Sequence, residues 1–280
     1  MTPLASGFCF GEGPRWFEGM LWFSDMLGEA VHTVDMTGSM TTLPVAGHAP
    51  SGLGFRPDGT LLIASTERRE ILAYDGDTVV TVANPADLAP AALGDMVIDD
   101  AGRAFIGSQA RSGGVILRLD PDDTVTVVAG GLDFPNGMVI TPDGSTLIVA
   151  ESTGRRLTAF PLRGDGALGE RRPFAEHLAG PPDGLAIDAE GGVWTSMTLA
   201  HEFVRIVDGG SQGAQVTDRI DTGGRTAIAC ALGGPEDRVL FLLTSTDAYP
   251  ERLVGSRDSR VDTVVVDVAG VHGAGVHGHV

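Results

Sequence analysis

The chain contains little cysteine and little basic charge, and each shortage excludes a class of protein. Only two cysteines occur among its 280 residues, Cys9 and Cys230. Two thiols so far apart provide neither a disulfide framework nor a zinc motif. The chain has 19 Lys and Arg against 37 Asp and Glu, a formal net charge of −18. This balance argues against a nucleic-acid partner, because binding to nucleic acid requires clustered basic side chains that neutralise phosphates.

Long apolar runs are also missing. The sequence contains no run of about 18 apolar residues, the length that a membrane-spanning helix requires. Its first residues, Met1 to Ser6, carry neither the basic start nor the apolar run of a secretory signal peptide. We therefore expect a cytoplasmic protein with no membrane partner.

Glycine is abundant by contrast, and it occurs in a repeating context. The 40 glycines and 16 prolines, with 42% hydrophobic residues and no long helical pattern, are typical of many short strands joined by tight turns. The clearest unit covers residues 135–152: a polar side chain, a short apolar strand, a Pro-Asp-Gly turn and a second apolar strand. Such a unit predicts a β-hairpin.

Six copies of this unit follow one another along the chain. Their leading residues are Glu12, Ser51, Gly94, Asn136, Asp183 and Ala227, in steps of 39, 43, 42, 47 and 44 residues. A repeat of this length is typical of one four-stranded propeller blade. Strand pairs between the copies, such as 71–74 with 78–82, supply the outer hairpin of each blade.

The repeat predicts an all-β protein, a six-bladed β-propeller of four-stranded blades around a central metal-containing channel. We expect one domain over residues 1–269, with the run 262–268 completing a blade together with the N-terminal segment. A monomer is expected, because a closed propeller leaves few strand edges to pair. The Gly/His-rich tail over 270–280 is predicted to be disordered.

The leading residues of the copies are the candidate site, because the innermost strand of every blade borders the channel. Glu12, Asn136 and Asp183 offer two carboxylates and one amide oxygen, without His or Cys. Such hard donors favour Ca²⁺, Mg²⁺ or Mn²⁺ over Zn²⁺. Two carboxylates facing a narrow channel are costly without a cation, so these residues are predicted to hold a metal. The alternative is that they only cap turns at the strand starts.

Further polar residues are weaker candidates. Ser51 occupies the ring position of the second copy, where it either contacts substrate or fills the channel wall as a small residue. His48, in a Gly-His-Ala-Pro loop just before it, is a candidate substrate contact. Glu151 and Ser152 end the second strand of their unit and are expected near the far rim.

Three motifs together resemble those of the SMP-30/gluconolactonase/luciferin-regenerating-enzyme (LRE)-like family. They are Gly11-Glu12-Gly13-Pro14-Arg15-Trp16, Pro135-Asn136-Gly137-Met138 and Pro182-Asp183-Gly184-Leu185. The resemblance covers residues from about 8 to 268. It implies a six-bladed propeller with one divalent metal, lactone-hydrolysing activity, the metal ligands Glu12, Asn136 and Asp183, and Asp183 as the candidate base.

The third copy departs from the family pattern. Many relatives carry an Asn-Asp pair there, often with an Arg shortly before, whereas this chain has Ala92-Leu93-Gly94-Asp95. The acid is kept, but Gly94 provides no amide, so water or substrate must complete the coordination. The sugar-lactone specificity of the better-known members is therefore not implied for this chain.

These residues suggest a divalent-metal-dependent hydrolase that opens a small-molecule lactone or similar cyclic ester. The metal, Ca²⁺ by preference with Mg²⁺, Mn²⁺ or Zn²⁺ as alternatives, polarises the carbonyl and activates water. Asp183 takes the proton of that water and Asp95 orients substrate or water. Three other functions stay open: hydrolysis of a phosphotriester or other ester, a non-hydrolytic metal-assisted biosynthetic step, and calcium binding without turnover.

Overall fold

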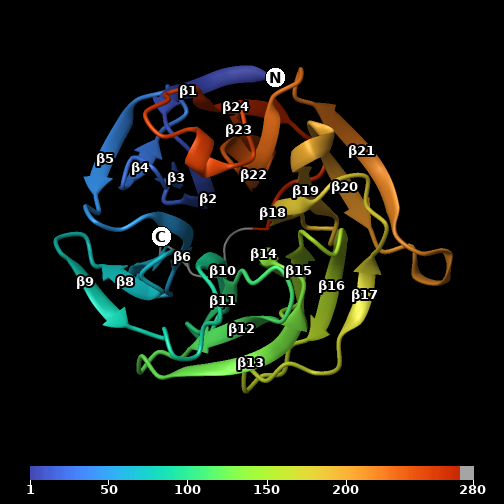
Figure 1. The fold of residues 1–280 in the computed structure, drawn as a ribbon. Coiled ribbons are helices and arrows are strands. Elements are labelled where there is room, and N and C mark those ends of the chain that lie inside the picture. The colour runs from blue at the N-terminus through green and yellow to red at the C-terminus, as the bar shows by residue number, and fades with distance from the viewer. Residues whose placement is uncertain (272–280) are drawn as a thin grey trace.

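The computed structural model describes residues 1–271, which form six four-stranded antiparallel sheets arranged in a ring (Figure 1). Each sheet is one blade. The innermost strand of every blade contacts the innermost strands of the two neighbouring blades, so these strands surround a central channel. The predicted six-bladed β-propeller is confirmed.

Five blades are each built from four consecutive strands that run from the channel outward. Blades one and two contain β2 (Gly11–Phe17), β3 (Met20–Asp25), β4 (Ala30–Val34), β5 (Met40–Pro44), β6 (Pro50–Phe55), β7 (Leu61–Ser65), β8 (Glu70–Tyr74) and β9 (Val79–Ala83). Blades three to five contain β10 (Leu93–Ile98), β11 (Ala104–Ser108), β12 (Gly114–Leu119), β13 (Val125–Leu132), β14 (Pro135–Ile140), β15 (Thr146–Glu151), β16 (Arg156–Pro161), β17 (Arg172–Ala175), β18 (Pro182–Ile187), β19 (Val193–Met197), β20 (Glu202–Val207) and β21 (Gln215–Asp221).

The sixth blade joins the two ends of the described chain. It contains β22 (Thr226–Gly233), β23 (Val239–Ser245), β24 (Ser259–Val265) and, outermost, β1 (Thr2–Phe8). The pairing of β1 with β24 places Thr2 opposite Thr263 and Phe8 opposite Ser259. The expected closure of a blade by the two terminal segments is thus confirmed, although the closing strand begins three residues earlier than the predicted run 262–268.

Short helices and a terminal bridge complete the described structure. Four 3-10 helices lie in connections: η1 (Thr198–Ala200), η2 (Gly210–Gln212), η3 (Pro235–Asp237) and η4 (Pro250–Arg252). Gly270 forms an isolated bridge with Asp188. The remainder of the predicted tail, residues 272–280, lies outside the described residues. Within 1–271, no helix has both the length and the apolarity that a membrane crossing requires.

The hairpin turns follow from local side-chain chemistry. In the Pro-Asp-Gly turn of blade four, Asp143 Oδ1 accepts a hydrogen bond from the Ser145 backbone N–H at 3.1 Å. Gly144 has φ +70°, a conformation that glycine adopts without strain. The turn of blade two repeats this pattern with Asp58, whose Oδ1 accepts from the Thr60 N–H at 2.9 Å. Such turns connect the innermost and second strands.

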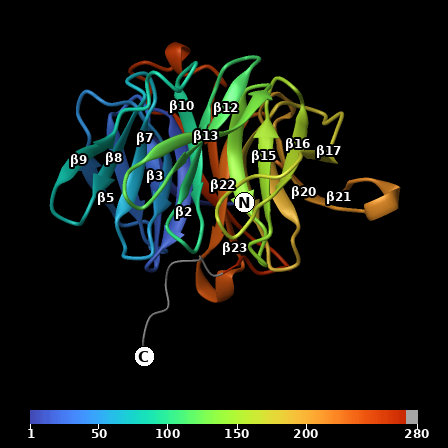
Figure 2. The same cartoon turned by 90° about the horizontal axis from the view of Figure 1, so that it is seen from below.

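Apolar side chains pack between blades rather than within one sheet. The second strands, such as β7 and β23, are buried along their whole length, while β5 and much of β21 are exposed at the outer edge. One cluster joins blades six and one, where Trp16 stacks on Phe241 with ring centroids 5.2 Å apart. Seen from the side, the strands run between the two faces of the ring (Figure 2). This packing holds the innermost strands rigidly around the channel.

Candidate active site in the central channel

Every innermost strand has a register irregularity close to its ring residue. The shifts fall between residues 12 and 15, 50 and 53, 93 and 96, 135 and 138, 182 and 185, and 227 and 229. A β-bulge bends its strand and changes the direction of nearby side chains. The repeated irregularity therefore explains how the leading residues of six separate copies come to one end of the channel.

A glycine follows most ring residues because neighbouring innermost strands approach very closely there. A Cβ on Gly137 would lie 2.3 Å from the backbone oxygen of Asp183, and a Cβ on Gly13 would lie 2.4 Å from that of Ser51. Real side chains do not tolerate such distances from backbone atoms. The Asn-Gly and Glu-Gly pairs of the repeat thus narrow the ring and bring its polar residues together.

Three carboxyl groups share the channel. Burial raises the pKa of Glu12 well above its usual value, and the charges of Asp183 and Asp95 raise it further. Burial likewise raises the pKa of Asp183 to about 8, with the charge of Asp95 adding to this and the amide of Asn136 opposing it. Glu12, Asp95 and Asp183 thus lie within electrostatic range of one another in a poorly solvated environment.

Asp183 carries an atom without a partner. Its Oδ1 is inaccessible to solvent and, within residues 1–271, accepts no hydrogen bond. A buried carboxylate oxygen in this state is costly, and a cation would remove the cost. Its neighbours Glu12 and Asn136 provide further oxygen donors of the kind that Ca²⁺ and Mg²⁺ prefer. The residues present therefore fit a divalent cation.

The amide of Asn136 is an oxygen donor of a different kind from the channel carboxylates. In the part of the chain that the structure describes, no three His, Cys, Asp or Glu side chains are grouped closely enough to hold a metal ion. A cation at this position would therefore need donors besides these side chains, and the amide oxygen of Asn136 is one that the ring offers.

Hydrogen bonds with Gln109, after β11, and with Ser152, after β15, hold the Asn136 side chain in one orientation. Gln109 Nε2 donates to Asn136 Oδ1 at 3.1 Å, Asn136 Nδ2 donates to Ser152 Oγ at 3.2 Å, and Ser152 Oγ donates to the carbonyl oxygen of Pro182 at 2.7 Å. The prediction that Ser152 lies near the far rim was wrong. The antiparallel pairing of β14 with β15 sets Glu151 opposite Pro135, which returns the end of the second strand to the level of the ring.

Glu151, expected at the same rim, has a structural role beside the ring. Its side chain is fully buried and accepts hydrogen bonds from Arg156 Nε at 2.8 Å and from the Asp133 backbone N–H at 2.7 Å. These contacts lower its pKa despite burial. Glu151 thus ties β15 to β16 and to the segment before β14.

Asp95 is engaged by an arginine that the sequence interpretation did not single out. Arg15 Nη2 lies 2.7 Å from Asp95 Oδ1, and the guanidinium also donates to the carbonyl oxygens of Pro14 and Met96. Burial raises the pKa of Asp95, whereas Arg15 lowers it. The only sequence signal for Arg15 is its place in the first of the three motifs.

The two proposed substrate contacts lie in different surroundings. Ser51 is buried on β6, and its backbone oxygen accepts a hydrogen bond from Ser24 Oγ at 2.7 Å. His48 Nδ1 lies 3.0 Å from Ser65 Oγ and 3.6 Å from Glu70 Oε2, both in blade two. The structure thus brings Ser51 to the ring and packs His48 against its own blade, and substrate contact by either stays a prediction.

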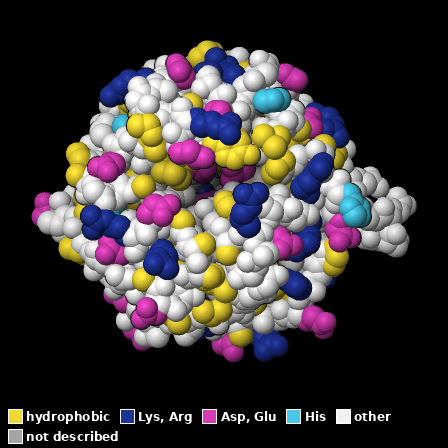
Figure 3. Space-filling view, in the orientation of Figure 1, with side chains coloured by type: hydrophobic (Ala, Val, Ile, Leu, Met, Phe, Trp, Pro, Cys, Tyr) yellow, Lys and Arg dark blue, Asp and Glu magenta, His cyan; other side chains and the backbone are white. Residues whose placement is uncertain are grey.

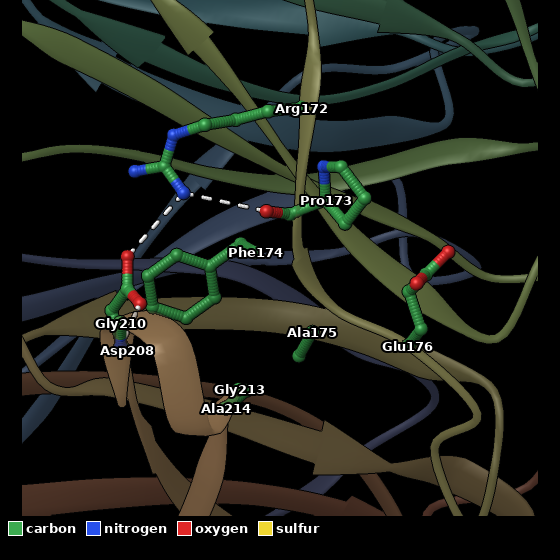
Figure 4. Close-up of a pocket in the computed structure, with 9 residues that line it drawn as sticks. All are labelled: Arg172, Pro173, Phe174, Ala175, Glu176, Asp208, Gly210, Gly213 and Ala214. Atoms are coloured by element: carbon green, nitrogen blue, oxygen red, sulfur yellow. Dashed lines mark hydrogen bonds and ion pairs between the residues drawn. The ribbon is translucent and has the colours of Figure 1, made fainter.

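The face of the ring shown in Figure 3 is hollowed at its centre, and hydrophobic, acidic and basic side chains lie around the hollow. A separate hollow of about 330 Å³ lies at the outer edge of the ring along β17 (Figure 4). There Arg172 Nη1 lies 3.3 Å from Asp208 Oδ2. None of its lining residues belongs to the ring, so the central channel is the candidate site.

Comparison with known proteins identifies the repeat. A family model described as SMP-30/gluconolactonase/LRE-like region matches residues 10–246. The pentonolactonase XacC of Haloferax volcanii is 30% identical over 242 residues, which cover 84% of this chain and 81% of the relative. The 6-deoxy-6-sulfogluconolactonase of Pseudomonas putida is 29% identical over 248 residues, 85% of this chain and 84% of the relative. Regucalcin of Xenopus laevis is 27% identical over 258 residues, which cover 86% of this chain and 85% of the relative.

Solved structures share the fold at lower sequence identity. A calcium-binding protein, regucalcin, from Agrobacterium tumefaciens superposes with a TM-score of 0.79 and 21% identity, covering 96% of this chain and 97% of its own. A luciferin-regenerating enzyme superposes with a TM-score of 0.78 and 20% identity, covering 95% of each chain. These similarities concern the propeller architecture.

Proposed function

The chain belongs to the SMP-30/gluconolactonase/LRE-like family, and from this premise we propose that it is a divalent-metal-dependent hydrolase that opens a lactone or similar cyclic ester. Glu12, Asn136 and Asp183 hold the metal in this proposal. Ca²⁺ is the preferred ion because the donors are oxygens, and Mg²⁺, Mn²⁺ and Zn²⁺ are the alternatives to test.

The observation that carries the proposal is the unpartnered Oδ1 of Asp183 beside Glu12 and Asn136 in the channel. A chain that only capped strand starts with these residues would have hydrogen-bonded this oxygen to backbone N–H groups. The reaction class comes from relatives named as lactonases, among them the pentonolactonase and the sulfogluconolactonase.

Each channel residue has a defined task in the proposed reaction. A bound divalent ion supplies Lewis acidity toward the lactone carbonyl and lowers the pKa of water. Asp183 accepts the proton of the attacking water at a carboxylate oxygen, and within residues 1–271 its Oδ1 has no hydrogen-bond partner that would compete for this role. Asn136, fixed by Gln109 and Ser152, keeps its amide in one orientation. Asp95, anchored by Arg15, orients substrate or water from the third blade.

A calcium-binding role without turnover is the second candidate, because relatives and a structural neighbour carry the name regucalcin. One assay separates the two functions. The purified chain is dialysed against EDTA and offered five- and six-membered lactones with and without added Ca²⁺. Ca²⁺-dependent ring opening supports the lactonase, while Ca²⁺ binding without opening of any lactone supports the alternative. Turnover that is equal with EDTA contradicts the metal-dependent mechanism.

The same assay covers the alternative of ester hydrolysis, while a non-hydrolytic metal-assisted step stays a prediction. Phosphotriesters and open-chain esters are tested beside the lactones, since the same ion and base serve both reactions. A small-molecule substrate without nucleic-acid or membrane partners, a monomeric state and a cytoplasmic location stay predictions from the sequence.

A further inference from the structure

We propose that Gln109 is a substrate-binding and positioning residue of the channel, and that it selects lactones that carry a hydroxyl group. The inference rests on the proposed lactonase function and adds to it the residue that accepts a hydrogen bond from a substrate hydroxyl. Gln109 follows directly after β11, and its side chain reaches Asn136 on the next blade. Three observations carry the proposal: a steric relationship with Gly94, a hydrogen-bond chain of fixed direction, and a free amide oxygen.

The steric relationship explains why the third ring position is glycine. A Cβ on Gly94 would lie 2.2 Å from Gln109 Nε2 and 2.5 Å from Gln109 Cδ. The Gln109 amide therefore fills the space that a side chain on residue 94 would occupy. Gly94 does not have a positive φ, so its backbone does not require glycine, but a Cβ there would displace the end of the flexible Gln109 side chain from its observed position.

The direction of the hydrogen-bond chain fixes which end of the Gln109 amide faces Asn136. The Pro182 carbonyl oxygen only accepts, so Ser152 Oγ donates to it and accepts from Asn136 Nδ2. Asn136 Oδ1 is then the end that faces Gln109, and it accepts from Gln109 Nε2. The carbonyl group of Pro182 thus determines the orientation of the Asn136 and Gln109 amides.

The remaining end of Gln109 is its carbonyl oxygen. Over residues 1–271, Gln109 Oε1 has no hydrogen-bond partner, and it is not sealed from solvent. This oxygen can only accept a hydrogen bond. An unsubstituted lactone ring has acceptors but no donor, so a substrate that uses Gln109 Oε1 has to bring a donor of its own. A ring hydroxyl is the donor group that a polyhydroxy-acid lactone supplies.

Binding of two non-hydrolysable probes tests the proposal independently of turnover. D-gluconolactam carries ring hydroxyls, and 2-piperidone is the matched six-membered lactam without them. The lactam N–H donor is common to both probes, so a difference between their responses reports on the hydroxyls. Calorimetry on the Ca²⁺-loaded chain should show that Gln109→Ala weakens binding of gluconolactam about tenfold and leaves 2-piperidone unchanged. Gly94→Ala should cause the same loss, because its methyl group displaces the flexible Gln109 amide. The Gly94→Ala/Gln109→Ala double variant should lose no more than either single variant.

Rescue and control variants complete the experiment. The Gly94→Asn/Gln109→Ala variant supplies an amide from residue 94 in place of residue 109 and should recover part of the gluconolactam affinity. Gln215→Ala removes an exposed glutamine from the outermost strand of blade five and should change nothing. Thermal melts show which variants fold. If Gly94→Ala does not fold, the comparison of the two probes on Gln109→Ala is sufficient to test the proposal.

The outcomes separate this proposal from the lactonase function. Equal losses for both probes, no loss for either, or no gluconolactam binding by the unmodified chain overturn the role of Gln109. A loss of Ca²⁺ affinity with an unchanged ratio between the two probes also overturns it, in favour of a metal ligand. A chain that binds gluconolactam through Gln109 but opens no lactone supports this inference while the proposed hydrolase fails.

Discussion

Arg15 on β2 and Asp95 on β10 form an ion pair, with Nη2 and Oδ1 2.7 Å apart, that joins blade one to blade three past the intervening blade. The side chains are 20% and 5% exposed. One of the three channel carboxylates is therefore balanced by a cation of the chain itself. Within residues 1–271, neither Glu12 nor Asp183 forms an ion pair, and the pKa of each is raised instead.

Replacing Arg15 should destabilise the metal-free chain. Arg15→Met leaves Asp95 buried without its partner, at a cost of about 3 kcal/mol in the free energy of unfolding measured with urea. Arg219→Met is the matched control, because it removes an exposed ion pair to Glu202 and should cost less than about 0.5 kcal/mol. Equal effects of the two substitutions would show that the channel pair is worth no more than a surface pair.

Asp183→Asn should abolish most turnover while preserving the fold. The amide keeps the shape of the carboxylate but cannot accept the proton of water, so kcat at saturating Ca²⁺ should fall by about 100- to 10,000-fold. Circular dichroism melts of the metal-free variant should be as high as those of the unmodified chain or higher, because the substitution replaces a buried, unpartnered ionisable group with a neutral one.

The control for this substitution is Asp100→Asn, which changes an exposed aspartate in the turn between β10 and β11. It should leave kcat unchanged. Full Ca²⁺-dependent turnover by Asp183→Asn would refute the assignment of Asp183 as the base.

Calcium should stabilise the chain more at alkaline than at acidic pH. The pKa of Asp183 is raised from 3.8 to about 8, so between these values the folded metal-free chain keeps a proton that the unfolded chain has released. Its free energy of unfolding therefore decreases as pH rises through this window. Ca²⁺ binds the deprotonated carboxylate and must displace the proton at lower pH.

Thermal melts with EDTA and with excess Ca²⁺ check this pH dependence. The increase in melting temperature caused by Ca²⁺ should be larger at about pH 9 than at about pH 6. Asp183→Asn should reduce this difference between the two pH values. An increase that is the same at both pH values would contradict a role for a carboxyl of raised pKa in binding.

Gly137→Ala should be strongly destabilising, because the added Cβ would meet backbone atoms of Asp183 and Leu185 at 2.3 and 2.6 Å. Neither backbone can move without widening the ring, so we expect a loss of about 3 kcal/mol in the free energy of unfolding. Gly164→Ala is the matched control: nothing lies within 4 Å of its added Cβ, and its φ is not positive. Equal free energies of unfolding for the two variants in denaturant titrations would refute the close approach of β14 and β18.

The repeat made the fold and part of the site predictable. Each unit encodes its own hairpin through Asp-Gly turns and apolar strands, so the spacing of six copies was sufficient to predict six blades and to place Glu12, Asn136 and Asp183 at equivalent positions. Identical positions in successive blades meet around one axis by symmetry. No knowledge of individual contacts was needed for that step.

Residues outside the equivalent positions could not be predicted in this way. Gln109 and Ser152 follow second strands and reach the ring only because antiparallel pairing returns those strand ends to the level of Asn136. Arg15 meets Asp95 across 80 residues of sequence, and a repeat alignment gives no sign of that contact.

The sequence by itself therefore determined the propeller and the equivalent positions of Glu12, Asn136 and Asp183 on its innermost strands, because both follow from local strand and turn preferences repeated at a constant interval. Only the tertiary structure decided which neighbours orient those donors, which carboxylate is already balanced by Arg15, and which side chain fills the space at Gly94. These properties depend on how closely adjacent blades approach one another. That distance is set by the packing of the whole ring and not by any single unit.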